Sequence, residues 1–183
     1  MTSHLRVYTD FAMTLREKLA GRLYINDIRL LAADDTLSAR EELYRLTDDT
    51  EERVGYNALW AMTHFASSAN GWLATKRDGL INQLLACSHV GKKRLLLTLL
   101  DRLPMQSEDI RTDYLDFCLS TINSSEPYAI RAFCMKQAYA QCRLYPELLQ
   151  EFSAILEMTD QSELSPGLKS AKRNILKQMA RAK

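Results

Sequence analysis

The 183-residue chain contains little glycine, proline or cysteine: six, four and four residues respectively. Beta-branched residues are also sparse, whereas alanine and leucine are plentiful, so the composition gives no support for strands. The cysteines form no CxxC pair and lack the tight spacing of zinc ligands. We therefore expect an all-helical chain with reduced, structural thiols and no metal.

Long apolar runs and a strong net charge are missing as well. The uninterrupted apolar stretches, such as residues 58–62, are far shorter than the ~20 residues needed to span a bilayer. The first ten residues do not have the basic, apolar and small-residue order of a secretory signal. The formal net charge is only +1, so no global field attracts nucleic acid or an anionic membrane. We expect a cytoplasmic protein without a membrane contact.

The chain shows no pattern typical of an active site. His4, His64 and His89 are isolated from one another, and no HExxH motif or glycine-rich phosphate loop occurs. The serines do not lie in a nucleophile elbow. The sequence therefore predicts no catalytic residue and no cofactor, and it gives no indication of an enzyme.

What the chain does contain is a helical apolar pattern, clearest in residues 49–65. The apolar residues there recur at helical spacing, at Val54, Ala58, Met62 and Phe65. Asp49 followed three residues later by Glu52 fits a capping box at the start of this helix. One face of the segment is thus expected to be buried.

The pattern of that helix returns three times along the chain. A small or apolar residue with similar neighbours four positions before and after it occurs at Ala58, Leu95, Cys134 and Ala171, at intervals of 37, 39 and 37 residues. A single helix pair cannot bury its apolar face alone, so a repeat of this length indicates stacked pairs. The prediction is an α-solenoid, an α-α superhelix of about ten helices in five antiparallel pairs.

The repeat divides the chain into one domain, 1–183, with several units. We assign 1–35 to an N-terminal capping helix pair and predict repeat units at 36–67, 75–103, 107–143 and 145–181. Three prolines, Pro127, Pro146 and Pro166, are predicted at the first positions of helices, where the missing amide costs nothing. Residues 66–76 have no clear pattern and are predicted to be a flexible loop.

Residues 130–134, IRAFC, resemble the start of the second helix in HEAT repeats: an apolar residue, arginine, two spacers and a small residue. Residues 49–58 resemble an acidic-turn version of the same start, and the resemblance extends over residues 37–179. It implies a right-handed superhelix that serves as a binding scaffold, and it implies no chemistry. The position of Arg131 is Gly55 in the first unit and Leu168 in the last, so an Asp–Arg ladder between units would be interrupted.

Three side chains form an aromatic candidate site. Tyr56, Trp60 and His64 are four residues apart on a stripe beside the buried face. Exposed rings of this kind would suit a peptide or a flat ligand. The alternative is that Trp60 packs between neighbouring helices, as large aromatic residues usually do.

A second candidate set is basic. Lys92, Lys93, Arg131 and Lys136 lie on successive second helices, which line the concave surface of a solenoid. Such a wall could bind an acidic peptide or a phosphate backbone. The alternative is that these cations belong to ordinary solvated helix faces.

The two ends of the predicted solenoid differ in charge. Residues 166–183 contain six basic residues and no acid, whereas residues 34–53 contain eight acids and three arginines. A terminal capping helix with a polar outer face would explain the basic end. Opposed charges also suggest a hypothesis of weak head-to-tail association, although the sequence defines no oligomeric state.

These patterns favour a non-enzymatic scaffold that binds a protein or peptide partner on its concave face. The alternative is a nucleic-acid-binding or DNA-repair protein, since alkylpurine DNA glycosylases are similar to HEAT-like solenoids and hold a duplex in a basic groove. That family uses an aromatic-lined notch with a catalytic aspartate, and neither feature is matched here residue by residue.

Overall fold

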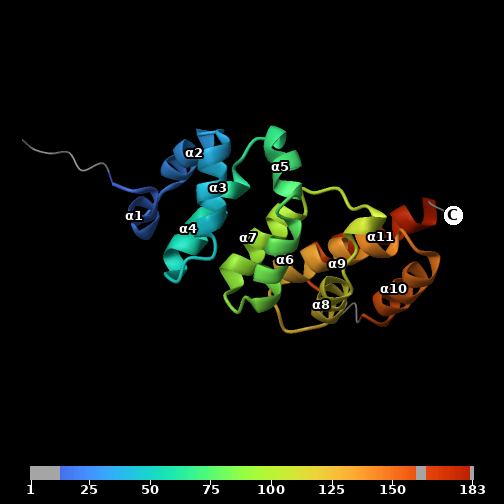
Figure 1. Ribbon diagram of the computed structural model, residues 1–183. Coiled ribbons are helices and arrows are strands. Elements are labelled where there is room, and N and C mark those ends of the chain that lie inside the picture. Colours follow the sequence, from blue (N-terminus) through green and yellow to red (C-terminus); the bar gives the residue numbers. More distant parts are fainter. Residues whose placement is uncertain (1–12, 160–163, 182–183) are drawn as a thin grey trace, which may run out of the picture.

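The computed structural model describes residues 13–159 and 164–181, and these ranges contain helices and no strand (Figure 1). Its α-helices are α1 (Leu15–Ala20), α2 (Ile25–Ala33), α3 (Leu37–Leu46), α4 (Glu52–Thr63), α5 (Asn70–Ala74), α6 (Arg77–Ala86), α7 (Val90–Leu100), α8 (Thr112–Ile122), α9 (Tyr128–Cys142), α10 (Pro146–Met158) and α11 (Pro166–Arg181). Two 3₁₀ turns, η1 (Ser67–Ala69) and η2 (Ser107–Asp109), complete the order. The predicted all-α class is confirmed.

The second helices of the predicted units stack into a continuous layer, which we call the inner row. Within it α4 packs against α7, α7 against α9, and α9 against α11. On the other side, α3 packs on α4, α6 on α7 and α8 on α9. Figure 1 shows the inner row running along the length of the molecule, from α4 near the N-terminal end to α11 near the C-terminal end. This is the stacking expected of an α-solenoid.

Both ends of the row carry additional helices. At the N-terminal end α1 and α2 pack on α4, and at the other end α10 packs on α9 beside α11. The predicted N-terminal capping helix pair covers residues 1–35, of which residues 1–12 lie outside the described part of the chain. The boundaries of the individual repeat units stay predictions.

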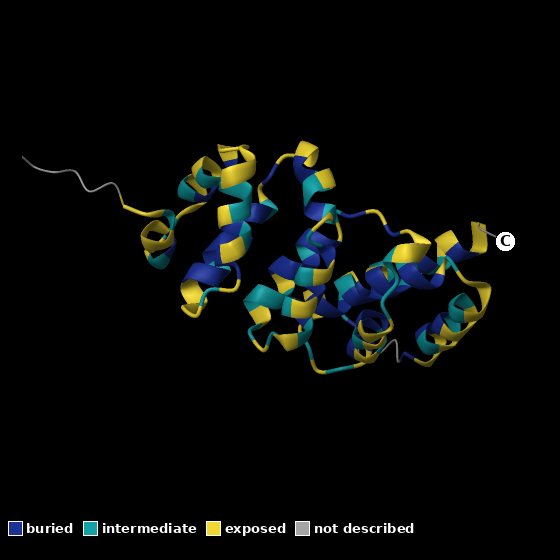
Figure 2. Cartoon of the chain, viewed as in Figure 1, coloured by how far each residue is buried: buried dark blue, intermediate teal, exposed yellow. Residues whose placement is uncertain are grey.

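The repeating apolar positions form the core. Val54, Ala58 and Met62 of α4 are fully buried, as their spacing predicted. Leu95 and Cys134, the equivalents of Ala58 in the next two units, are buried too. Figure 2 shows dark blue, buried stretches of ribbon in helices along the whole molecule. The core therefore extends from unit to unit without interruption.

Polar contacts join the units, and the two residues of each contact lie about one repeat length apart in the sequence. The Glu41 carboxylate accepts hydrogen bonds from the Trp72 indole and from Lys76, 31 and 35 residues further on, each at 2.8 Å. The Asp101 carboxylate accepts one from Lys136 at 2.9 Å across 35 residues. Each such contact connects a residue of one unit to the corresponding region of the next.

The predicted capping box at Asp49 and Glu52 is wrong. The N-cap of α4 is Glu51, and no side chain caps this helix. The Asp49 carboxylate instead accepts hydrogen bonds from the Arg16 guanidinium at 2.8 and 2.9 Å and from the Glu51 amide at 2.9 Å. An arginine 33 residues away thus holds both carboxylate oxygens in a bidentate charged pair, which adds geometric specificity to two charge-assisted hydrogen bonds.

The prediction of a flexible loop at residues 66–76 is also wrong, since η1 and α5 occupy most of that segment. The Trp72 indole donates to Glu41 on α3, and the Arg102 guanidinium donates to the side-chain oxygen of Asn70 at 2.6 and 3.0 Å. Contacts from two other units therefore hold a segment that has no helical pattern of its own.

The proline positions are confirmed at two sites and shifted at the third. Pro146 and Pro166 are the first residues of α10 and α11. Pro127 is the N-cap of α9, one position before the helix begins. The fixed φ of proline and its missing backbone N–H suit both the N-cap and the first helical position, since neither position needs to donate a hydrogen bond within the helix.

Two glycines of the inner row, Gly55 in α4 and Gly91 in α7, lie at close contacts. A Cβ atom at Gly55 would lie 2.7 Å from the backbone carbonyl oxygen of Thr47, and one at Gly91 would lie 2.9 Å from the Tyr56 ring. Both distances are below normal van der Waals contact. A side chain at Gly55 would meet the backbone at the end of α3, and one at Gly91 would displace the Tyr56 ring of α4.

A pair of glycine substitutions tests the close contact at Gly55. Gly55→Ala is expected to lower the free energy of unfolding by about 1–3 kcal/mol, because the added methyl meets fixed backbone. Gly71→Ala, in α5, places its methyl in open space and is expected to raise stability by about 0.5–1 kcal/mol through helix propensity. Urea denaturation of both variants measures the difference, and a stabilised Gly55→Ala would contradict the packing described.

A second test concerns the acid dependence of the Asp49 contact. The hydrogen bonds from Arg16 and from the Glu51 amide hold the pKa of Asp49 below its ordinary value of 3.8. The carboxylate therefore stabilises the fold fully above pH 3.8, and this contribution is lost as the pH falls through the lowered pKa.

Asp49→Asn is accordingly expected to lower the melting temperature at neutral pH, with a gap to the wild type that closes below pH 3.8. Circular dichroism melts across this range provide the measurement. Asp48→Asn is the matched control, since Asp48 is exposed and has no ion pair among the described residues. An equal loss at neutral pH in the control would contradict the role given to Asp49.

Candidate interaction surface

Tyr56 and Trp60 lie on the same side of α4 and are both half-buried. Their ring centroids are 6.4 Å apart, and the Tyr56 ring also meets the edge of His89 at 5.9 Å. Tyr56 rests over Gly91 of α7, where any side chain would displace it. The two rings thus pack against the core and remain partly exposed, and their role in binding stays a prediction.

A groove runs beside these rings, between α4 and the connection from α1 to α2. Its volume is about 420 Å³, and we call it the α4 groove. The residues that line it are Gly21, Arg22, Leu23, Arg53, Tyr56, Asn57 and Trp60. The aromatic candidates Tyr56 and Trp60 therefore belong to a concave site.

The wall of the α4 groove is fixed by Asn57. Its buried side-chain amide donates to the carbonyl of Leu19 at 2.8 Å and to that of Gly21 at 3.4 Å. These carbonyls end α1 and begin the connection to α2. Because Asn57 ties this connection to α4, the shape of the groove is defined before any ligand binds, which reduces the entropy cost of binding.

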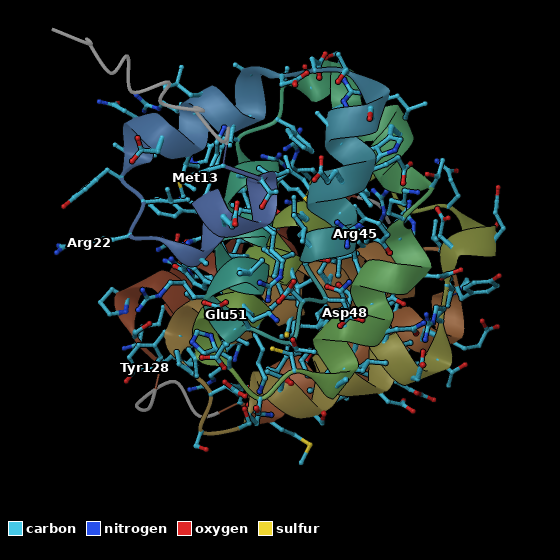
Figure 3. The ribbon with its side chains drawn as sticks, turned by 60° about the vertical axis from the view of Figure 1, so that its left-hand side comes forward. Met13, Arg22, Arg45, Asp48, Glu51 and Tyr128 are labelled. Carbon is cyan, nitrogen blue, oxygen red and sulfur yellow. The ribbon has the colours of Figure 1, made fainter. Side chains whose placement is uncertain are left out.

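The α4 groove combines aromatic, apolar and cationic groups. Arg22 and Arg53 are both exposed, and the Arg22 guanidinium lies 5.3 Å from the centre of the Tyr24 ring. Figure 3 shows the Arg22 side chain extending away from the ribbon. Within residues 13–159 and 164–181, neither arginine forms a salt bridge. Such a site can bind a carboxylate next to an apolar or aromatic side chain.

His64 lies one turn beyond Trp60 but does not line the α4 groove. It is the exposed C-cap residue of α4. Partial burial, together with the nearby Arg29, lowers the pKa of His64 below 6.5. The imidazole is therefore neutral at pH 7, and it adds no charge to this end of the inner row.

Two of the basic candidates are paired with carboxylates. Lys93 forms a salt bridge with Glu126, which lies in the connection before α9. Lys136 pairs with Asp101 at 2.9 Å, and its ammonium lies 5.7 Å from the centre of the Phe133 ring. Both salt bridges connect the α7 region to the α9 region. These two lysines therefore stabilise the packing of neighbouring units.

The other two basic candidates lie against backbone. Arg131 is 9% exposed, and its Nε donates to the carbonyl of Ile122 at 2.8 Å, which satisfies a free carbonyl in the last turn of α8. The Lys92 ammonium lies 3.0 Å from the point that a Cβ of Gly55 would occupy. The structure thus does not bring the four predicted cations together as an open basic wall.

The sequence interpretation missed Arg22, Leu23 and Arg53. Arg53 could have been found, because it lies three residues before Tyr56 on the same helix face. Arg22 and Leu23 lie in the connection between α1 and α2, and only the packing of that connection on α4 places them beside Trp60. No sequence signal points to that proximity.

The four thiols of the described part of the chain are free, and three of them are buried. The buried thiols are Cys118, Cys134 and Cys142, and Cys87 is half-buried. Burial raises the pKa of Cys142 to about 11 and that of Cys118 well above its ordinary value, so both remain protonated at neutral pH. No cluster of three or more histidine, cysteine or acidic residues capable of holding a metal occurs within the described ranges.

Comparison with known proteins finds a family model that matches most of the chain. Residues 15–179 match a family model described as a HEAT repeat domain. No curated protein and no solved structure matches the chain. Among the described helices, none is both long enough and apolar enough to cross a membrane.

Arg131 and Lys136 have different roles, and the free energy of unfolding of their variants can distinguish them. Arg131→Met is expected to lower the free energy of unfolding by about 1.5–3 kcal/mol, because it removes a charged donor from a buried carbonyl. Lys136→Met breaks an exposed ion pair and is expected to cost at most about 1 kcal/mol. Chemical denaturation compares the two, and equal losses would show that Arg131 is not a structural residue.

Proposed function

The chain belongs to the HEAT-repeat family, and from this premise we propose that it is an interaction scaffold that binds a peptide segment of a partner protein. The proposed binding surface is the open face of the inner row, with the α4 groove as its principal contact. No reaction is part of the proposal. Stacked helix pairs supply a long surface at fixed spacing, which suits an extended segment better than a small molecule.

The observation that carries the proposal is the composition of the α4 groove. Tyr56 and Trp60 are held in place by their neighbours and remain half-exposed, and the exposed Arg22 and Arg53 lie beside them. Tyrosine, tryptophan and arginine are the residues most often found at the energetic centre of protein interfaces. A peptide with an acidic residue next to an apolar or aromatic one would match both kinds of group.

Further contacts along the inner row would come from the predicted cations that retain exposure. Lys136 is exposed beside Phe133, and Lys92 is half-exposed. Arg131 and Lys93 contribute mainly by holding the units in register. His64 would lie at the edge of the bound segment.

The nucleic-acid alternative receives less support from the contacts. A phosphate backbone requires a series of available cations. Lys93 and Lys136 are paired with carboxylates and Arg131 is buried, which interrupts the series. The net charge of +1 supplies no compensating field.

Selection of displayed random peptides on the full chain tests the proposal and requires no candidate partner. Peptides with an acidic residue beside an apolar or aromatic residue are expected to be enriched. Binding of a selected peptide, measured by fluorescence anisotropy, is expected to weaken about 30-fold or more in Trp60→Ala, in line with the loss of a central interface residue.

Two further variants separate binding from folding. Arg53→Glu changes an exposed charge in the α4 groove and should weaken binding while the melting temperature is retained. Tyr145→Ala removes an exposed aromatic ring outside the α4 groove and should bind as the wild type does. Equal binding by wild type and Arg53→Glu, or selection of nucleic acid over peptide by the wild type, would contradict the proposal.

A further inference from the structure

Helix α11, at the C-terminal end of the inner row, has two different sides. Leu168, Ile175 and Met179 are buried, and the helix packs on α9. Lys169, Arg173 and Lys177 are exposed at four-residue spacing, and the helix contains no acid. A terminal helix needs a polar outer side for solubility, but it does not need one sign of charge.

Part of this outer side forms a pocket of about 550 Å³, which we call the α11 pocket. The residues that line it are Leu164, Lys169, Lys172, Arg173, Leu176, Lys177 and Ala180. Leu176 and Ala180 supply its accessible apolar surface, and three of the four cations are exposed around it. This combination suits a ligand that is both acidic and apolar.

Lys172 makes the α11 pocket more than a solvated charged face. The residue is 6% exposed, and its ammonium donates to the carbonyl of Thr159 at 3.3 Å. A buried cation is costly unless an anion or several acceptors compensate it. In the described part of the chain, Lys172, Lys169 and Arg173 form no salt bridge.

The opposite end of the molecule carries a surface of complementary character. Leu30, near the end of α2, is 74% exposed, and Leu37, at the start of α3, is 63% exposed. Between them lie the exposed acids Asp34 and Asp35, of which Asp35 also pairs with Arg40 of α3. We call these four residues the α2–α3 corner, and Figure 2 shows the exposed ribbon around it.

Exposed apolar side chains are concentrated at this end. Within the described residues, five of the nine large apolar side chains that are exposed lie between residues 13 and 37. The Asp34 carboxylate accepts hydrogen bonds from the Thr36 amide and hydroxyl, at 3.2 and 2.9 Å, which fixes the turn that presents the two leucines. The corner is therefore a preformed acidic and apolar projection.

We propose that the α11 pocket binds the α2–α3 corner of a second copy of this chain, so that copies associate head to tail. Leu30 and Leu37 contact Leu176 and Ala180, and the two aspartates lie among the exposed cations of α11. Figure 1 places α2 and α3 at one end of the molecule and α11 at the other, so the contact joins two copies. It does not depend on the α4 groove or on the function proposed above.

The geometry determines the kind of assembly. The two surfaces differ, so each copy that uses one of them still presents the other, and the assembly remains open. Because the contact combines a small pocket with exposed charges, it is expected to be weak and to weaken further with salt.

Sedimentation velocity of the full chain provides the first measurement. In buffer of about 50 mM salt, the weight-average sedimentation coefficient should rise with concentration, and in about 500 mM salt, where the screening length is short, the rise should be largely lost. A wild type that sediments as a monomer over the whole range at both salt concentrations would overturn the proposal.

Two double variants identify the surfaces. The corner variant carries Leu30→Lys and Leu37→Lys, and the pocket variant carries Lys169→Glu and Lys177→Glu; all four positions are exposed, so both are expected to fold. Each variant alone should remain monomeric. An equimolar mixture should form a 1:1 dimer that does not grow, because the corner variant keeps its pocket and the pocket variant keeps its corner.

A control variant and a second probe complete the test. Val90→Lys with Tyr145→Lys replaces two exposed side chains elsewhere, and this variant should associate as the wild type does. Association that persists in both the corner and the pocket variant would overturn the proposal. A monomeric wild type that binds phosphatidylserine vesicles, with binding lost in the pocket variant, would likewise overturn it and would assign the α11 pocket to an anionic lipid surface.

Discussion

The structure depends on burying helix faces that no single helix pair can cover. In the inner row each helix covers the apolar side of the next, from α4 through α7 and α9 to α11. Close approach is part of this constraint, since Gly91 of α7 leaves room for the Tyr56 ring of α4, and Gly55 of α4 leaves room for the carbonyl that ends α3. Ala58, Leu95 and Cys134 are buried because the stacking repeats from unit to unit. The hydrophobic core is therefore spread along the row and is not concentrated at one place.

The same stacking decides which charges are available for binding. Lys93 and Lys136 neutralise carboxylates of neighbouring elements, and Arg131 satisfies the end of α8. Side chains in the middle of the row thus hold the units in register. Available groups gather where the stacking stops: at the α4 groove beside the connection between α1 and α2, and at the α11 pocket beyond the last contact of the row. The two proposed interaction sites lie at opposite ends for this reason.

Much of the fold could be predicted from the sequence. The spacing of Val54, Ala58 and Met62 gave the buried face of α4, and the repeat near 40 residues gave the stacking. Both are local or periodic properties, which a single chain records directly. For the candidate site the sequence supplied the pair Tyr56 and Trp60, because they share one helix face. It could not supply Arg22, whose proximity depends on how a connection packs.

By itself, the sequence determined where most of the helices form, which side of the α4 helix is apolar, and that the units stack. Only the tertiary structure decided which partner each long polar side chain finds. Asp49 binds Arg16 rather than capping α4, and Trp72 and Asn70 order a segment without a pattern of its own. The physical reason is the same in each case: these contacts join residues about one repeat apart, across an interface between units, and their energies depend on distances that only the packed helices set.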